Sequence, residues 1–389
     1  MKLVYVATDP VTAYRLMDGQ LGYMRRQGFD VTVITAPGPL LEQTAEREGV
    51  GAIGVPMLRE PAPLKDVVAL ARLTTTLRRL APTIVNAGTP KAGLLGVMAA
   101  RAARVPVVVY LLRGLRFEGA SGARRLLLAG AEHVAGGLAH RVVVNSESLR
   151  RRFVGLGCAP LEKTWVPGAG SSNGVAAERF RPSAERKVWA RRERARLGIP
   201  GNAVVAGFVG RFAKDKGLGD LLGAFRSAAE REPRLRLLLV GDRDATDPLP
   251  DADSRLISDD PRVFTTGFVD EPARYYQMMD LFVFPSYREG FPNAPLEAAA
   301  AALPVLAFAA TGTIDAVLSG ETGTLVPVGD VRALADGLVR YAQDDALRGG
   351  HGSAGLERAE RHFRQESVWR SLADEYRRLA RERVPFAAG

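Results

Sequence analysis

The sequence predicts two doubly wound α/β domains, each built on a parallel β-sheet that helices cover on both faces. Three observations support this fold class. The chain has 389 residues, enough for two or three domains of about 150 residues each. Short β-branched runs alternate with helical patterns in both halves, as in repeated βαβ units. Residues 166–174 (VPGAGSSNG) lack a periodic apolar pattern and predict a break between the halves.

The first half opens with a short apolar run at residues 3–7, which predicts a buried strand. We expect further strands at 31–35, 84–85, 105–111 and 141–145, and helices at 14–26, 91–103 and 123–139. These strands are apolar without alternation. Such strands are typical of a parallel sheet that is covered on both faces.

The same alternation restarts after the break. We expect strands at 203–209, 236–240, 262–266, 281–285 and 305–308, and helices at 218–231, 272–279 and 294–302. The Arg-rich amphipathic segment 367–383 predicts a terminal helix that packs back across the first half. The expected domains are therefore 1–180 and 181–366, with 367–389 as the returning helix.

Composition excludes several classes of protein. The chain is 47% hydrophobic and 25% charged, as in ordinary globular proteins. No uninterrupted apolar run approaches the roughly 20 residues of a membrane span. The one cysteine, Cys158, cannot form an internal disulfide, and the four histidines show no metal-ligand spacing. The first residues are too short for a signal peptide. We therefore expect a cytoplasmic protein with no metal and no cofactor.

The positive charge is concentrated in the first half. Residues 1–180 carry 23 Lys and Arg against 13 Asp and Glu, which accounts for the whole net charge of +10. This excess favours an acidic partner, and we expect peripheral contact with an anionic membrane on its inner face. The candidate contacts are Arg113, Arg116, Arg124 and Arg125, beside the apolar run 126–128. Nucleic acid is not expected, because no motif that binds it accompanies the charge. The alternative is that the charge only keeps an Arg-rich chain in solution.

The first chemical motif is YREGFPNAPLE at residues 287–297. It places Glu289 in a turn after the strand at 281–285, and Glu297 about one turn into a helix that Pro295 can start. We expect exposed amides at Gly290 to Asn293, which would suit an anion at the helix start. Carboxylates accept hydrogen bonds from sugar hydroxyls and helix-terminal amides bind phosphate. The motif therefore predicts a nucleotide-sugar site.

The second motif is GFVGRFAKDKG at residues 207–217, in which a strand runs into a basic loop and then a helix. Arg211 and Lys216 can hold a diphosphate from two sides, one as a planar fork and the other as a point charge. The alternative is a solvated basic turn.

Both motifs resemble those of the retaining glycosyltransferases of family 4, which have the GT-B fold. The resemblance covers essentially the whole chain. It extends to LVGD at 239–242, GFV at 267–269, GETG at 320–323, TPKAGLLG at 89–96, LRGL at 112–115 and GSSNGV at 170–175. It implies two Rossmann-like domains with a cleft between them. The last three segments resemble the subgroup that builds exopolysaccharide, capsule or lipid-linked oligosaccharides.

The resemblance also implies a role for each site residue. Arg211 and Lys216 would hold the donor diphosphate, Glu297 the ribose hydroxyls, and Glu289 the transferred sugar. The remaining donor-binding residues would be Gly290, Phe291, Pro292, Asn293, Phe268, Val269 and Gly241, with Phe268 and Val269 bordering the base. Thr12, Lys91 and Arg113 would lie on the acceptor side.

The reaction that the resemblance implies is transfer of a sugar, with retention, from a nucleotide sugar to a hydroxyl of a lipid-linked saccharide or polysaccharide precursor. The donor would be a UDP-sugar. No covalent carboxylate is needed, because a phosphate oxygen of the departing nucleotide can deprotonate the acceptor.

This chain departs from the family pattern at three places. Many members have a Gly-Gly loop where this chain has residues 9–12, a His at position 113, and a His before TPKAGLLG, where this chain has Asn86-Ala87-Gly88. Acceptor chemistry can therefore differ. The alternatives are a natural-product or other small-molecule acceptor, a nucleotide-sugar 2-epimerase or phosphorylase, and a noncatalytic partner in polysaccharide assembly.

Two further patterns are rejected as sites. The Asp251-Ala252-Asp253 triplet matches a metal-binding motif of another glycosyltransferase fold, but we expect it in a Pro- and Asp-rich loop away from a strand end. Gly168-Ala169-Gly170 begins like a dinucleotide fingerprint, yet Asn173 stands where the third glycine is required.

Overall fold

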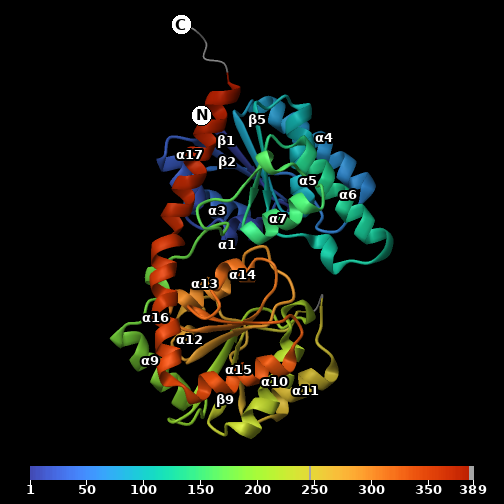
Figure 1. Cartoon of the computed structure of the whole chain (residues 1–389). Coiled ribbons are helices and arrows are strands. Elements are labelled where there is room, and N and C mark those ends of the chain that lie inside the picture. Colours follow the sequence, from blue (N-terminus) through green and yellow to red (C-terminus); the bar gives the residue numbers. More distant parts are fainter. Residues whose placement is uncertain (245–246, 385–389) are drawn as a thin grey trace. The chain divides into compact units, whose positions relative to one another are not determined.

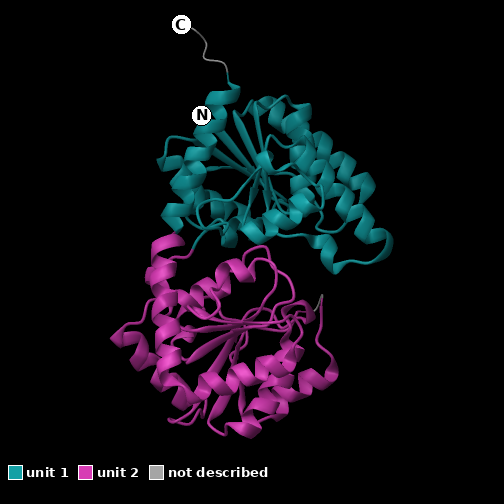
Figure 2. Cartoon of the chain, viewed as in Figure 1, with its two compact units in different colours: residues 1–174, 365–389 teal, residues 175–364 magenta. Residues whose placement is uncertain are grey.

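The structure is a computed structural model that describes residues 1–244 and 247–384 (Figure 1). The chain divides into two compact units (Figure 2): unit 1 is Met1–Gly174 with Gln365–Gly389, and unit 2 is Val175–Arg364. Each unit contains one parallel sheet with helices on both faces, so the predicted fold class is confirmed. Within the described residues, no helix combines the length and apolarity that crossing a membrane requires.

Unit 1 has a seven-stranded sheet in the order β3-β2-β1-β4-β5-β6-β7. All pairs of neighbouring strands are parallel. The central strands are almost entirely buried because they are covered on both faces. The strands are β1 Lys2–Val6, β2 Asp30–Thr35, β3 Gly51–Gly54, β4 Ile84–Gly88, β5 Val107–Leu112, β6 Arg141–Val144 and β7 Thr164–Trp165.

The helices of unit 1 form two layers. One face is covered by α4 Pro63–Leu80, α5 Pro90–Ala102, α6 Gly122–Leu138 and α7 Glu147–Gly155. The other is covered by α1 Pro10–Leu16, α2 Gln20–Arg26, α3 Pro39–Glu48 and the terminal helix α17 Gln365–Arg383. Within that second layer, Trp369 and Tyr376 of α17 share a core with Tyr5 of β1. The terminal helix is thus an integral part of unit 1 (Figure 2).

Unit 2 has a six-stranded parallel sheet in the order β10-β9-β8-β11-β12-β13. In this order β9 and β10 lie on one side of β8, and β11 to β13 lie on the other side. The connections that follow neighbouring strands β8 and β11 therefore run in opposite directions. Ligands of doubly wound sheets bind at such a switch point, outside the carboxyl ends of the strands. The strands are β8 Val204–Val209, β9 Leu235–Val240, β10 Val263–Thr265, β11 Leu281–Phe284, β12 Val305–Phe308 and β13 Gly323–Val326.

The helices of unit 2 also form two layers. One core contains residues of α10 Leu218–Arg231, α11 Asp251–Asp259 and α15 Val331–Gln343. The other contains residues of α8 Ala177–Phe180, α9 Ala184–Arg196, α12 Ala273–Tyr276, α13 Asn293–Ala300, α14 Thr313–Ala316 and α16 Asp345–His362.

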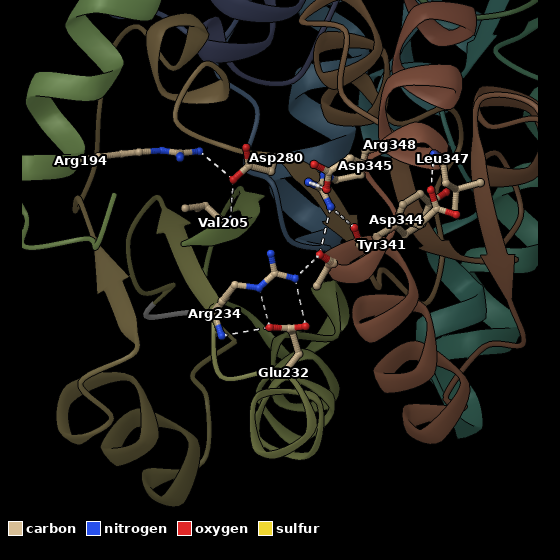
Figure 3. A network of polar contacts seen from close by, with 11 residues as sticks. Arg194, Val205, Glu232, Arg234, Asp280, Tyr341, Asp344, Asp345, Leu347 and Arg348 are labelled. Atoms are coloured by element: carbon tan, nitrogen blue, oxygen red, sulfur yellow. Dashed lines mark hydrogen bonds and ion pairs between the residues drawn. The ribbon is translucent and has the colours of Figure 1, made fainter. Parts of the chain in front are cut away.

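The amino edge of the unit 2 sheet is closed by a polar network (Figure 3). One oxygen of Asp280, just before β11, accepts the backbone N–H of Val205 at 2.7 Å and a guanidinium N–H of Arg194 at 2.9 Å. Arg234, just before β9, pairs with Glu232 and donates to the carbonyl of Ala342 at 3.1 Å. These side chains satisfy one another, so this edge is built for stability.

Three local predictions are wrong. The helix expected at 14–26 is two helices, α1 and α2, interrupted at residues 17–19, where Gly19 has a positive φ of 76°. Helix α13 begins at Asn293, and Pro295 lies inside its first turn, where a missing N–H costs nothing. Residues 251–253 form the first turn of helix α11 and not a loop.

Candidate donor site

The candidate donor site lies at the carboxyl edge of the unit 2 sheet, where the loops after β8 and β11 touch. Gly217 has a left-handed φ of 68°, and a Cβ there would overlap the carbonyl oxygen of Pro285. Only glycine permits this approach. It brings Lys216, at the end of the first loop, beside Glu289 in the second.

Glu289 and Lys216 form an ion pair. Nζ of Lys216 lies 2.7 Å from Oε1 of Glu289, and the Ser286 hydroxyl donates to the same oxygen at 2.8 Å. Both side chains are mostly buried. The structure thus brings together two predicted site residues from motifs about 70 positions apart. The ammonium of Lys216 has further N–H groups with which it can bind an anion.

Arg211 makes a different set of contacts. Its Nη1 pairs with Asp244, and its Nη2 lies 3.9 Å from Oδ2 of Asp215. About half of its side chain is exposed. Arg288 approaches the same Asp215 oxygen at 3.9 Å. Arg211 and Lys216 therefore come from one loop but have separate acidic partners.

Glu297 lies in the second turn of α13, and Oε2 accepts a hydrogen bond from the hydroxyl of Tyr276 at 2.8 Å. Burial raises the pKa of the Glu297 carboxyl above its ordinary value, while the Tyr276 hydrogen bond and the charge of Arg179 oppose that rise. Burial and the neighbouring carboxylate also raise the pKa of Tyr276. The tyrosine is a neutral donor that fixes one oxygen of Glu297.

The expectation of exposed amides at residues 290–293 is wrong. Gly290, Phe291 and Pro292 are buried and Asn293 is partly buried, and a proline has no amide N–H. The Phe291 ring packs on Phe363, with 5.4 Å between ring centroids. These residues hold the loop that carries Glu289 against the core.

Glycine positions also bring the remaining loops together. The amide of Gly241 donates to the carbonyl of Gly267 at 3.1 Å, and a Cβ at Gly241 would overlap the carbonyl oxygen of Gly210. The loop after Gly267 carries Phe268, whose ring is largely exposed, and Val269, which packs on the core. An exposed aromatic ring beside the loop that carries Arg211 is suited to border a flat ligand group.

Two of the acceptor-side candidates have structural partners in unit 1. The backbone N–H of Thr12 donates to Oδ1 of Asp9 at 3.0 Å, so this pair caps α1. Nζ of Lys91 lies 2.6 Å from Oδ1 of Asp66 and also donates to the carbonyl of Glu60. Lys91 therefore ties α5 to the start of α4.

Arg113 follows β5, and two of its guanidinium nitrogens, Nε and Nη2, are buried without a hydrogen-bond partner among the described residues. Burial lowers the pKa of Arg113 to about 10, although Tyr5 and Tyr376 oppose this effect. Its expected role as a surface contact for membrane is wrong, because its side chain lies among these tyrosines. A buried cation without an acidic partner is costly, which makes Arg113 a candidate for binding an anion.

Sequence reasoning missed several residues of these sites. Ser286 and Tyr276 orient the two glutamates, and Asp215 and Asp244 hold Arg211. Asn86 donates to the hydroxyl of Tyr376 near Arg113. Asn86 stood out in the sequence only as a departure from the family pattern, although a polar residue inside an otherwise apolar strand is itself a usable signal.

Comparisons with known proteins agree with this architecture. Residues 17–169 match the family model described as "Glycosyl transferase 4-like domain", and residues 203–344 match "Glycosyl transferases group 1". The solved structure of Anabaena Alr3699/HepE in complex with UDP superposes with a TM-score of 0.79 at 22% identity, over 97% of this chain and all of that one. The fold and the two family models together place the chain in the class of GT-B glycosyltransferases.

Two curated relatives indicate the family within this class to which the chain belongs. The chain is 33% identical over 367 residues to the capsular polysaccharide biosynthesis glycosyltransferase CapM of Staphylococcus aureus, covering 94% of each chain. It is 26% identical over 355 residues, or 89% of each chain, to the UDP-Gal:alpha-D-GlcNAc-diphosphoundecaprenol alpha-1,3-galactosyltransferase of Escherichia coli. The chain belongs to the GT-B glycosyltransferases of family 4.

Proposed function

We propose that this glycosyltransferase moves a sugar, with retention, from a UDP-sugar to a hydroxyl of a lipid-linked saccharide in polysaccharide biosynthesis. The observation that carries the proposal is the carboxyl edge of unit 2, where Glu289, Lys216, Arg211 and Glu297 follow neighbouring strands. The names of CapM, of the diphosphoundecaprenol-dependent galactosyltransferase and of the UDP complex support the pathway, acceptor and donor.

In this proposal each charged group meets one part of the donor. Glu297 accepts the ribose hydroxyls through Oε1, since the Tyr276 hydroxyl donates to Oε2. Lys216 and Arg211 exchange their acidic partners for the diphosphate, and Glu289 then binds hydroxyls of the transferred sugar. The exposed Phe268 ring borders the uracil, with Val269 and Gly241 shaping the loops beside it. Residues 290–293, of which the first three are buried, position the loop that carries Glu289.

Retention follows if the acceptor attacks on the face from which the nucleotide leaves. A phosphate oxygen of the departing nucleotide then takes the acceptor proton, so Glu289 need not act as a nucleophile. Lys216 and Arg211 stabilise the negative charge that develops on the diphosphate. This scheme needs no metal ion and no cofactor.

We assign acceptor recognition to unit 1, with Arg113 as the group that binds an anionic part of the substrate. Thr12 and Lys91 shape that region through the α1 cap and the contact with Asp66. The positive first half of the chain and a lipid-linked acceptor together support a cytoplasmic enzyme that works at the inner face of the membrane.

The function is tested by screening nucleotide sugars for a rise in melting temperature, since a ligand that binds only the native state stabilises it. We expect uridine compounds to raise it and guanosine compounds not to. Transfer assays then compare lipid-linked with small soluble acceptors. Transfer only to a soluble acceptor would replace the lipid-linked assignment, and turnover of donor without any acceptor would indicate an epimerase.

The two glutamates should have separable roles. Glu297→Ala should weaken UDP binding, whereas Glu289→Ala should mainly lower kcat, because the first meets the nucleotide and the second the moving sugar. Loss of a charge-assisted hydrogen bond costs about 1.5 to 3 kcal/mol, or roughly ten- to hundredfold. Calorimetry and initial rates measure both effects. Glu321→Ala, an exposed glutamate of unit 2, is the control. Unchanged UDP affinity in Glu297→Ala would overturn the assignment.

The basic loop offers a matched comparison. Arg211→Ala and Lys216→Ala should each lower kcat at least about tenfold, because both stabilise the leaving diphosphate. Lys214→Ala removes the same charge from an exposed position of the same loop and should leave kcat nearly unchanged. The wild-type rate should also survive EDTA. Inactivation by EDTA with recovery in manganese would contradict the metal-free scheme and return attention to Asp251 and Asp253.

Arg113→Gln should raise the KM for a phosphate-bearing acceptor about tenfold or more while leaving UDP affinity unchanged, because it removes the buried cation. Steady-state kinetics with calorimetry separate the two effects. Arg151→Gln, at an exposed position on α7, serves as the control. A loss of UDP affinity without a change in acceptor KM would show that Arg113 binds the donor.

A further inference from the structure

The most exposed apolar surface of unit 1 lies where α4 and α6 begin. The side chains of Leu64 and Val67 in α4 are 86% and 66% exposed, and those of Leu126 and Leu127 in α6 are 76% and 61% exposed. Leu58, in the loop before α4, and Val68, in α4, are also exposed. We call these six residues the α4–α6 patch. Isolated apolar residues are normal on a surface, but a cluster of this kind indicates an interaction site.

The α4–α6 patch is not needed for the core of unit 1. Helix α4 contributes Ala69, Leu73 and Leu77 to that core, and α6 contributes Ala135. The patch residues stand at other positions of the same helices and in the loop before α4. Only Leu128, of the apolar run 126–128, packs partly against the core.

The two helix starts are joined by one carboxylate. Glu60, in the loop before α4, binds Arg116 at 2.5 Å and Arg124 at 3.1 Å. Asp66, in the first turn of α4, is paired with Lys91 of α5. These ion pairs place the beginning of α6 next to the loop that precedes α4.

This surface carries an excess of positive charge. Glu60 is shared between two arginines and Asp66 is neutralised by Lys91. Arg59, Lys65 and Arg125 are exposed next to the patch residues. An apolar cluster with a basic margin matches an anionic bilayer, where leucine and valine enter the interface and lysine and arginine reach the headgroups.

We propose that the α4–α6 patch docks unit 1 on an anionic lipid bilayer. The proposal rests on the proposed lipid-linked acceptor, to which it adds the docking surface. It extends the surface expected from the sequence to α4, removes Arg113 from it, and keeps Arg116 only as the partner of Glu60. The patch enters the headgroup region, and Arg59, Lys65, Arg124 and Arg125 bind lipid phosphates.

The test is co-sedimentation of the full chain with vesicles of phosphatidylcholine, alone or mixed with phosphatidylglycerol. We expect binding only to the mixed vesicles, with a decrease at high salt. Leu64→Ser/Val67→Ser and Leu126→Ser/Leu127→Ser should each lower the partition coefficient about tenfold or more, and Lys65→Gln/Arg125→Gln by a similar factor. The control pair Leu161→Ser/Val328→Ser changes exposed apolar residues outside the patch and should bind like wild type.

Three results would overturn the proposal. The first is that the wild type fails to bind anionic vesicles at low salt. The second is that the patch variants bind vesicles as well as the wild type does. The third is that the chain forms a dimer in solution and the same variants dissociate it. The last result would assign the patch to a second copy of the chain. Measuring UDP affinity distinguishes failure of this proposal from failure of the proposed function. Patch variants should keep UDP affinity, and Glu297→Ala should keep vesicle binding, so either proposal can fail alone.

Discussion

The close approach of the 211–217 loop to the end of β11 is the constraint on which the candidate donor site depends. Gly217 touches the carbonyl of Pro285, and only a residue without a side chain allows that contact. The approach places Lys216 2.7 Å from Glu289 and leaves Ser286 to hold the same carboxylate oxygen. The ammonium of Lys216 and the carboxylate of Glu289, from motifs far apart in the sequence, thereby lie in direct contact. The ion pair compensates two opposite charges in a mostly buried place.

The two edges of the unit 2 sheet differ in the way that doubly wound folds require. At the amino edge, Asp280, Glu232 and Arg234 satisfy their polar partners within the protein. At the carboxyl edge, Arg211 and Phe268 remain substantially exposed. The amino edge is therefore closed by internal polar contacts, whereas the carboxyl edge keeps an arginine and an aromatic ring exposed. Arg113 of unit 1 also has polar atoms that the protein leaves unsatisfied, because its buried Nε and Nη2 lack hydrogen-bond partners among the residues that the structure describes.

The sequence predicted the fold well because buried parallel strands are continuous apolar runs. It also predicted Glu289, Lys216 and Glu297 as a site, and the structure brings the first two into contact. It failed where the outcome depended on tertiary contacts. Whether residues 290–293 are exposed depends on Phe363, about 70 residues away, and the identity of the Glu297 partner depends on Tyr276. The exposure of Leu64 and Val67 likewise depends on which face of α4 meets the sheet.

Hydrogen exchange with and without UDP tests the central claim most directly, that the donor binds at the carboxyl edge of unit 2. With UDP bound, we expect slower amide exchange in peptides that cover residues 211–217 and 286–300. Exchange at 232–236 and 341–348, on the amino-edge network, should not change. Protection confined to the amino edge, or no protection at 286–300 at saturating UDP, would contradict the account.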